Sequence, residues 1–355
     1  MSESTKKDGR LFWVGVILAP IIFLLGNFIL ILSAPVVQIF VLLKLTYSFN
    51  TIVFPTVLTI ISFYGIIVRK KNRSKNRILL ISATYLFAAV CIFGLRIYAT
   101  HIEPYRLILR EVTIKTPKVH RPVRILHLSD IQSAAVKSHE KRVFKKIRSL
   151  DPDIVLYTGD FVQPIPPATP LSELKEIADL FRSLDAPLGK FGVYGNVDWR
   201  IRKLPHGEIE GVKILESEHV LVMFGKIRIN IFGLSERQSV GQTDTLRKIT
   251  AWLSTTTPRD FTILMGHRPD YILSVQDVPI DLCLAGHTHG GQIRLPLIGP
   301  IITFSQIPRS WARGYREIGK TRLNVSAGIG SEHSAGLPSI RINCPPEMTL
   351  IELCP

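Results

Sequence analysis

The sequence predicts about three transmembrane helices followed by an α/β domain. Three long apolar stretches lie within the first hundred residues, and short apolar runs alternate with amphipathic segments from Val123 onward. The chain has 355 residues, of which 46% are hydrophobic and 20% are charged, and its mean hydropathy is +0.24. This composition excludes an intrinsically disordered chain and argues against a purely soluble protein.

Each of the apolar stretches is long enough to cross a bilayer, which takes about 20 residues of helix. The stretches are Leu11–Ser33, Leu45–Val68 and Ile78–Tyr98. The segment Ala34–Leu43 can extend either of its neighbours. A cleaved signal peptide explains the first stretch poorly, because two more apolar stretches follow it. We therefore expect residues 1–102 to form a membrane region.

The distribution of positive charge predicts the orientation of this region. Residues 1–102 carry eleven Lys and Arg against two acids, which is +9 of the formal net charge of +16. Six of these basic residues lie in the loop Arg69–Arg77, whereas only Lys44 lies between the first two spans. By the positive-inside rule this loop and the basic N-terminal tail face the cytoplasm. With three spans, the rest of the chain then lies on the extracytoplasmic side of a cell membrane, and nucleic acid is not an expected partner.

Beyond the spans, residues 103–122 are expected to form a linker and a first strand, Leu109–Ile114, and residues 123–355 to form the α/β domain. Apolar runs predict strands at Val123–Leu128, Ile154–Thr158, Phe191–Tyr194, Ile227–Phe232, Phe261–Met265, Ile280–Leu284 and Leu323–Val325. Helical periodicity predicts helices at His139–Leu150, Leu171–Leu184 and Thr243–Ser254. Strands outnumber helices in the second half, which favours a mixed sheet. The four cysteines show no CxxC spacing and do not indicate a disulfide framework, although pairing of Cys344 with Cys354 stays open.

Polar side chains follow five of the apolar runs, in short turns. The turns are Ser129-Asp130-Ile131-Gln132, Gly159-Asp160, Gly195-Asn196-Val197-Asp198, Gly266-His267 and Gly286-His287-Thr288-His289. Ligands collect beyond the carboxyl ends of strands in open α/β sheets, so these turns are expected to meet at one cleft. Carboxylates, amides and imidazoles together suit divalent Mn, Fe, Zn or Co. Each turn alone has an ordinary structural explanation as a cap or an Asx turn.

The order of the five turns resembles the calcineurin-like metallophosphoesterases, whose motifs run DxH, GD, GNH(D/E), GH and GHxH. The resemblance covers roughly residues 123–353. Within the family, the segments Gly286–Gln292 and Asn343–Glu347 look like the bacterial membrane-associated phosphodiesterase branch. The resemblance implies a four-layer αββα sandwich, in which two mixed β-sheets are flanked by helices, as the fold of a metallophosphoesterase domain at residues 123–355.

The resemblance also implies two divalent metal ions. It places one ion on Asp130, Asp160 and His289, with Gln132 where the family usually has histidine, and a second on Asp160, Asn196, His267 and His287. Asp160 would bridge the ions, and Asp160, Asn196 and His287 would form the catalytic group. Two bridged cations acidify a water molecule into a nucleophile and neutralise charge on the phosphoryl oxygens.

Two residues depart from the family pattern. The amide oxygen of Gln132 is a harder and weaker ligand than imidazole, so the first metal is expected to be labile or a different ion. Val197 stands where many members have the histidine that protonates the leaving group or steadies the phosphate. Since a phosphate leaving group needs little protonation, Val197 favours a pyrophosphate or an activated diester over an alkyl monoester.

Three further features have both a functional and a structural interpretation. Trp199, Arg200 and Arg202 can form a rim that grips a phosphate, or a solvated turn. The segment Ile293–Ile307 can dip into lipid as a hydrophobic loop, or be a buried excursion of the core. His127 is expected to be structural.

These observations favour a membrane-anchored phosphoesterase that hydrolyses a phosphodiester or pyrophosphate bond of a phospholipid or lipid-linked phosphate through metal-activated hydroxide. One alternative is the UDP-2,3-diacylglucosamine pyrophosphatase of lipid A synthesis, which the family includes but which needs a cytoplasmic site. A second is a catalytically impaired sensor or scaffold, in which Gln132 and Val197 mark a decayed site. A nuclease is a third, weakened because the basic excess lies mainly beside the spans.

Overall fold

The computed structural model describes residues 3–34, 37–71, 74–204, 209–241 and 243–355. The chain divides into two compact units, which are described separately. The helical unit comprises Met1–Ile102 together with Ser334–Pro338, and the α/β unit comprises Glu103–His333 together with Ser339–Pro355.

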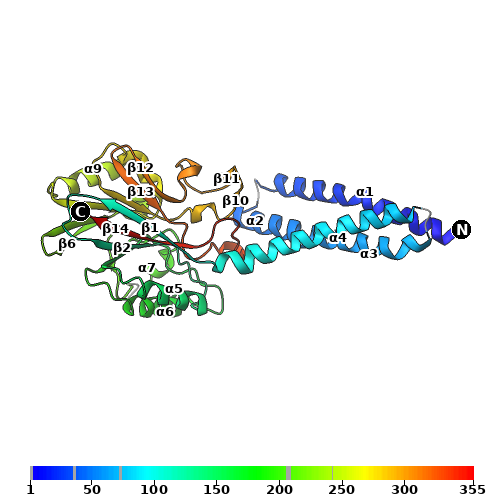
Figure 1. Cartoon of the computed structure of the whole chain (residues 1–355), viewed down its shortest axis with the longest axis horizontal. Helices are drawn as coiled ribbons and strands as arrows, with labels where there is room; N and C mark the ends of the chain where they lie inside the picture. Colours follow the sequence, from blue (N-terminus) through cyan, green and yellow to red (C-terminus); the bar gives the residue numbers. More distant parts are fainter. Residues whose placement is uncertain (1–2, 35–36, 72–73, 205–208, 242) are drawn as a thin grey trace. The chain divides into compact units, whose positions relative to one another are not determined.

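The helical unit contains helices that are long and apolar enough to cross a membrane (Figure 1). Its helices are α1 (Glu3–Leu32), α2 (Ile39–Ser48), α3 (Phe54–Val68) and α4 (Lys75–Ile97). The three candidate spans are Gly9–Leu32, Ile39–Val68 and Lys75–Tyr105. The prediction of three spans is thus confirmed by length and composition, and residues 39–44 extend the second span. A π-helical turn at Phe49–Val53 joins α2 to α3 ahead of Pro55, which has no backbone N–H to donate.

Polar side chains within the spans find partners on neighbouring helices. Asn27 and Asn50 exchange two amide hydrogen bonds of 3.1 and 2.9 Å between the first and second spans. Arg96 in α4 donates from Nη1 to Thr51 Oγ1 at 2.8 Å. Hydrogen bonds of this kind hold helices together where lipid gives no hydrophobic driving force for their association.

The first sheet of the α/β unit is mixed, as predicted, and contains both ends of that unit's chain. Its strand order is β1-β14-β2-β3-β4-β5. The strands are β1 (Ile108–Lys115), β14 (Glu347–Cys354), β2 (Val123–Leu128), β3 (Ile154–Tyr157), β4 (Lys190–Gly192) and β5 (Lys213–Ile214). β14 lies parallel to β1 and antiparallel to β2, and the remaining pairs are parallel.

The second sheet is also mixed and has the strand order β12-β13-β9-β8-β7-β6. Its strands are β12 (Gly314–Ile318), β13 (Thr321–Val325), β9 (Leu282–Ala285), β8 (Asp260–Met265), β7 (Ile227–Gly233) and β6 (Glu218–Phe224). The two outer pairs are antiparallel and the three inner pairs are parallel. A separate two-stranded ladder joins β10 (Arg294–Leu295) to β11 (Gly299–Pro300).

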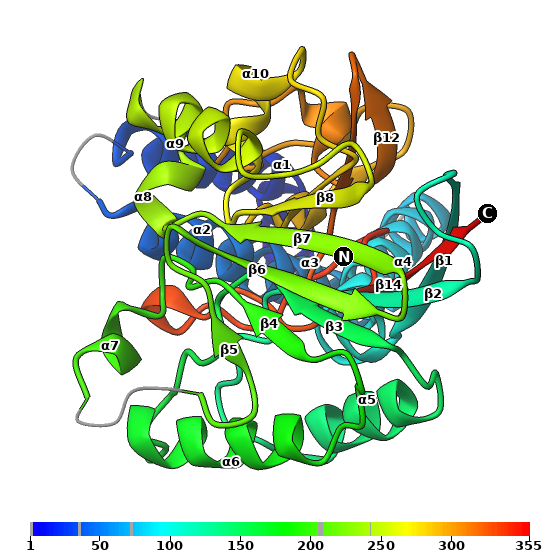
Figure 2. The same ribbon diagram turned by 90° about the vertical axis from the view of Figure 1, so that its left-hand side faces the viewer.

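Alternating side chains along the strands build the αββα sandwich. On β2, Ile125 faces the second sheet, whereas Leu126 and Leu128 pack with helices on the other face. Those helices are α5 (Ser138–Arg148) and α6 (Pro170–Arg182), and α9 (Thr243–Leu253) and α10 (Ile272–Val275) cover the outer face of the second sheet (Figure 2). Two short helices, α7 (Trp199–Arg202) and α8 (Glu236–Ser239), complete the unit. The predicted four-layer fold is confirmed.

Several strands escape sequence-based prediction. The sequence does not predict β5, β6, β10, β11, β12 or β14, and the strand predicted at Ile280–Leu284 is Leu282–Ala285. β6 is largely exposed, so its apolar pattern is weak. In β14 the polar residues Glu347 and Thr349 are fully buried. Arg110 and Arg313 neutralise the Glu347 carboxylate at 2.6 Å each, a compensation that only the tertiary fold supplies.

Candidate metal centre

Turns from both sheets carry the polar residues that the sequence singles out. Asp130 and Gln132 follow β2, and Asp160 follows β3. Asn196 comes four residues after β4, and His267 comes after β8. His287 and His289 follow β9. Within each sheet the strands that carry these turns are parallel to one another, β2, β3 and β4 in the first and β8 and β9 in the second, so their carboxyl ends lie at one edge of the sheet.

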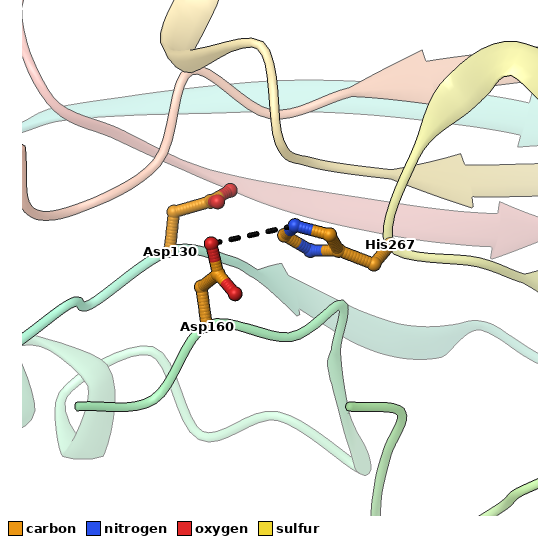
Figure 3. Close-up of side chains that lie close together, drawn as sticks. All are labelled: Asp130, Asp160 and His267. Atoms are coloured by element: carbon orange, nitrogen blue, oxygen red, sulfur yellow. Dashed lines mark ion pairs between the residues drawn. The ribbon is translucent and has the colours of Figure 1, made fainter. Parts of the chain in front are cut away.

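Asp130, Asp160 and His267 form the centre of the cluster (Figure 3). One ligand atom from each lies within 4.8 Å of the other two, and all three residues are buried. His267 Nε2 lies 3.4 Å from Asp160 Oδ2. Two carboxylates and an imidazole converging in this way match the ligands of a divalent transition metal.

The other four predicted residues join this centre. Asn196 Oδ1 and His287 Nδ1 lie 3.0 and 3.2 Å from His267 Nε2. Gln132 donates from Nε2 to Asp160 Oδ2 at 2.9 Å, and His289 Nε2 lies 3.7 Å from Asp130 Oδ1. The fold therefore brings all seven residues into one connected group.

Backbone strain is concentrated in the same turns. The φ angles are +50° at Asp130, +61° at Asp160 and +66° at His287, a region that side chains other than glycine rarely adopt. Such strain persists where the surrounding structure fixes it, often at functional sites. Glycine lets the turns approach closely: a Cβ on Gly195 would lie 2.1 Å from Asp160 Oδ1, and one on Gly286 would lie 2.3 Å from Asp130 Oδ2.

Backbone carbonyls select one tautomer of each inner histidine. His267 Nδ1 lies 2.8 Å from the Thr158 carbonyl, and His287 Nε2 lies 3.1 Å from the Phe304 carbonyl. Since a carbonyl only accepts, each of these nitrogens donates its N–H. In the neutral ring this leaves His267 Nε2 and His287 Nδ1 as lone pairs facing the centre, as hydrogen-bond partners of metal-binding histidines usually do.

Asp198 organises two of the turns, a role that sequence reasoning did not assign. Its buried carboxylate accepts backbone N–H bonds from Gly195 at 2.7 Å, Asp160 at 2.8 Å and Phe161 at 2.9 Å. The carboxylate thus fixes the Asp160 turn against the Asn196 turn. The available signal was its place as the acid that ends Gly195-Asn196-Val197-Asp198.

Arg341, fully buried, supports the loop beside Asp130 and was also missed. Its guanidinium donates to the carbonyls of Ala327 at 2.7 Å, Gly330 at 2.5 Å and Cys344 at 2.9 Å. The Gly330 N–H in turn donates to the Asp130 carbonyl at 2.7 Å. Cys344 is a free thiol that donates to the His289 carbonyl at 3.4 Å, so the open alternative of pairing with Cys354 is not realised.

The charges of the central residues are strongly coupled. Burial would raise the pKa of Asp160, but the adjacent His267 outweighs it and holds that pKa at about 2. Burial would lower the pKa of His267, yet Asp160 raises it to about 9. Burial and the negative Asp160 raise the pKa of Asp130 to about 7, and burial lowers that of His287 to about 3. The negative charges of the Asp130 and Asp160 carboxylates are therefore stabilised by one nearby positive charge, that of protonated His267.

The side chains of the cluster also fit a metal ion, which would supply the positive charge that the two carboxylates need. Gln132 Oε1 and the ring nitrogen His289 Nδ1 are buried and have no hydrogen-bond partner within the part of the chain that the structure describes. Buried polar atoms left without partners are costly, and a cation would satisfy them. Oxygen and imidazole nitrogen, without thiolate, suit the divalent ions predicted above.

The turn that follows the centre is only partly available to a ligand. Trp199 is 52% exposed, and Arg200 lies over its ring at 5.4 Å from the centroid. Arg202 is paired with Glu216 at 2.6 Å. Arg202 thus already has a partner, whereas Trp199 and Arg200 contact each other at the surface.

A family model described as calcineurin-like phosphoesterase matches residues 123–291. A metallophosphoesterase of Bacillus subtilis, YkuE, which is described as uncharacterized, is 32% identical over 269 residues, covering 72% of this chain and 88% of the relative. The chain thus belongs to the calcineurin-like metallophosphoesterases, and the expected superfamily is confirmed. It is a metal-dependent hydrolase of phosphoester bonds with an Asp/Asp/His metal-binding site. The α/β unit, which contains this site, is called the catalytic unit from here on.

Two other bacterial relatives have named activities. The phosphodiesterase YaeI of Escherichia coli is 27% identical over 213 residues, covering 57% of this chain and 70% of the relative. The UDP-2,3-diacylglucosamine pyrophosphatase LpxG of Chlamydia trachomatis is 28% identical over 251 residues, covering 56% of this chain and 74% of the relative.

Proposed function

We propose that this protein belongs to a membrane-associated branch of the family and hydrolyses a phosphodiester or pyrophosphate bond of a lipid-linked substrate. Residues 1–102 act as the anchor and residues 123–355 as the catalytic domain. The supporting observation is that the cluster of Asp130, Asp160 and His267 occurs in a chain with three candidate membrane spans. Tethering raises the effective concentration of lipid headgroups, a gain that a soluble substrate does not need.

The seven clustered residues divide into two sets in this proposal. Asp130, Gln132, Asp160 and His289 hold one ion, and Asp160, Asn196, His267 and His287 hold the other. When bound, divalent Mn, Fe, Zn or Co would supply Lewis-acid chemistry, neutralising phosphoryl charge and lowering the pKa of water. Asp160 lies between the sets, with one oxygen 3.4 Å from His267 Nε2 and 2.9 Å from Gln132 Nε2.

Val197 narrows the class of bond that is cleaved. Its backbone N–H donates to Asp160 Oδ1 at 2.9 Å, so the turn keeps its structural role. Its side chain cannot give a proton to a leaving group. A phosphate leaves readily without protonation, which favours a pyrophosphate or an activated diester over an alkyl monoester.

The alternative activity is that of a UDP-2,3-diacylglucosamine pyrophosphatase. The 28% identity to LpxG and the place of Val197 favour it. It requires the catalytic unit to face the cytoplasm, whereas the basic loop Arg69–Arg77 favours the opposite orientation. A catalytically impaired sensor or scaffold is the remaining alternative, because Gln132 and Val197 depart from the family pattern.

The proposal is tested with the full chain in detergent, by measuring metal content and the hydrolysis of a panel of substrates. The panel is a chromogenic diester, UDP-diacylglucosamine, phospholipid diesters and an alkyl monoester. We expect bound metal and a preference for diesters or pyrophosphates. A preference for the alkyl monoester would contradict the assigned bond class, and a protein with neither metal nor activity would be the sensor or scaffold.

Asp160→Asn tests the bridging role directly. The change removes one negative charge from the centre, and we expect diester hydrolysis to fall by about a thousandfold together with metal content. Asp244→Asn is the matched control, because Asp244 is 45% exposed on α9 and only approaches Lys248. Unchanged hydrolysis in Asp160→Asn would refute the bridging role.

A further inference from the structure

An exposed apolar hairpin follows the metal-binding turn of His287 and His289. We define the apolar hairpin as residues 293–304, which contain β10 and β11. Leu297 at its tip is fully exposed, at 107%, and Ile298 is 69% exposed. Ile301 and Phe304 are 46% and 50% exposed. The buried alternative for this segment is therefore wrong for its tip, and exposed apolar patches of this kind mark binding surfaces.

The base of the apolar hairpin is fixed to the metal centre. The Phe304 carbonyl accepts the Nε2–H of His287 at 3.1 Å, and Arg294 donates to the Gly290 carbonyl at 2.8 Å. The backbones approach so closely that a Cβ on Gly291 would lie 2.3 Å from Pro300 Cβ. A molecule held on the apolar hairpin is thus held beside the His287 side of the centre.

The segment of chain that contains the apolar hairpin is rich in arginine. Between Asp281 and Glu317 the chain has four arginines and no acid. The arginines are Arg294, Arg309, Arg313 and Arg316, of which Arg313 is paired with Glu347. An apolar tip bordered by basic residues matches the boundary of a bilayer, where hydrocarbon lies next to anionic phosphate.

The chain also supplies a bilayer within reach. Its third candidate span ends at Tyr105, and β1 begins at Ile108. Only Arg106 and Leu107 separate them. If the span lies in a membrane, this short connection tethers the catalytic unit to it, so the effective concentration of lipid at the catalytic unit is high.

We propose that the apolar hairpin inserts Leu297 and Ile298 into the acyl region of the bilayer and guides a lipid-linked substrate, phosphate first, to the His287 side of the metal centre. The choice of substrate rests on the proposed function. Membrane insertion does not, and it is measured separately.

Insertion is tested with a spin label on the full chain in lipid vesicles. Cys91 and Cys354 are replaced by serine, because they are the cysteines that are not buried, and the label is attached at Leu297→Cys. The matched control is a label at Leu171→Cys, since Leu171 is 60% exposed on α6. We expect the Leu297 label to be accessible to oxygen but about threefold or more less accessible than the control to a water-soluble nickel complex. Accessibility equal to the control overturns insertion, and so does shielding from both reagents, which indicates a protein partner or a second copy of the chain.

The guiding role is tested with Leu297→Ser combined with Ile298→Ser. We expect the ratio of phospholipid or UDP-diacylglucosamine hydrolysis in vesicles to soluble chromogenic diester hydrolysis to fall about tenfold. Leu171→Ser should leave this ratio unchanged. An equal loss on both substrates overturns the guiding role and makes the hairpin structural. If the wild type cleaves the soluble diester but none of the lipids, the lipid substrate of the proposed function fails, while the spin-label result still decides insertion.

Discussion

Asp198 shows how one buried carboxylate can set the geometry of a site without belonging to its proposed ligands. It accepts three backbone N–H bonds from the turns that present Asp160 and Asn196. Burial, and then the charge of Asp160, raises the pKa of Asp198 to about 7. The backbone N–H groups that Asp198 holds in place thus also stabilise its negative charge. We expect the loss of this carboxylate to weaken metal binding more than it destabilises the fold.

Asp198→Asn should therefore lower the affinity for metal. An amide offers one accepting oxygen in place of two, so at least one buried N–H loses its partner, at a cost of about 1–3 kcal/mol. We expect the free energy of unfolding to fall by that amount and diester hydrolysis to fall about tenfold or more at limiting metal, with partial recovery at excess metal. Metal titrations of activity measure this, with Asp244→Asn as the control. An unchanged metal dependence would show that Asp198 is only structural.

At Gln132 a substitution is expected to increase the affinity for metal, in contrast to Asp198→Asn. Its Oε1 is buried and has no partner among the described residues, and its Nε2 donates to Asp160. Gln132→His should raise the affinity for Zn or Mn about tenfold, because imidazole is the better ligand for borderline ions. Equilibrium dialysis measures the affinity, and Gln306→His at an exposed position is the control. No gain in affinity would contradict the assignment of Gln132 as a ligand.

At the scale of elements, a buried histidine links the two sheets. Asn324 on β13 donates to His127 Nδ1 at 2.7 Å, so His127 on β2 donates from Nε2 to Thr158 Oγ1 at 2.9 Å. Burial lowers the pKa of His127 to about 3. The structural role expected for this residue agrees with these contacts, which use both ring nitrogens.

The low pKa of His127 predicts an acid-sensitive sandwich. In the unfolded chain the imidazole titrates near pH 6.5, so the folded state gains stability above that pH and loses it as pH falls toward 3. By pH 5 the loss is about 2 kcal/mol. His127→Gln can keep both hydrogen bonds but does not titrate, so its unfolding free energy should fall less between pH 7 and pH 5. Denaturant unfolding at the two pH values measures this, with exposed His219→Gln as the control; equal losses in wild type and His127→Gln would refute it.

The sequence predicts the inner strands and the meeting of the polar turns well, because both follow from local pattern and from the rule that parallel strands end at one edge. It does not predict β14, whose partners β1 and β2 lie far away in the chain and whose Glu347 is neutralised only in the fold. The support from Asp198 and Arg341 is missed because their partners are backbone groups, which no side-chain pattern marks, and because some of them, such as the N–H of Asp160, lie far away in the chain. The metal-binding roles of all seven clustered residues as a set stay predictions.

At the scale of the whole molecule, the orientation in the membrane determines which lipids are available. The loop Arg69–Arg77 and three spans predict that the catalytic unit is extracytoplasmic. An alkaline phosphatase reporter fused after Pro355 should then be active, and a green fluorescent protein fused there should be dark. The same reporters fused after Ser74 should give the opposite result. A cytoplasmic signal after Pro355 would favour the UDP-2,3-diacylglucosamine pyrophosphatase alternative.

The position of β14 between β1 and β2 also affects how the protein matures. A ribosome releases the spans and the first ligand-bearing turns well before it makes Glu347–Cys354, which fills the gap in the sheet. Until then β1 and β2 each have one unpaired edge. We therefore expect a nascent chain that still lacks this strand to be hydrolytically silent and open to chaperones or proteases.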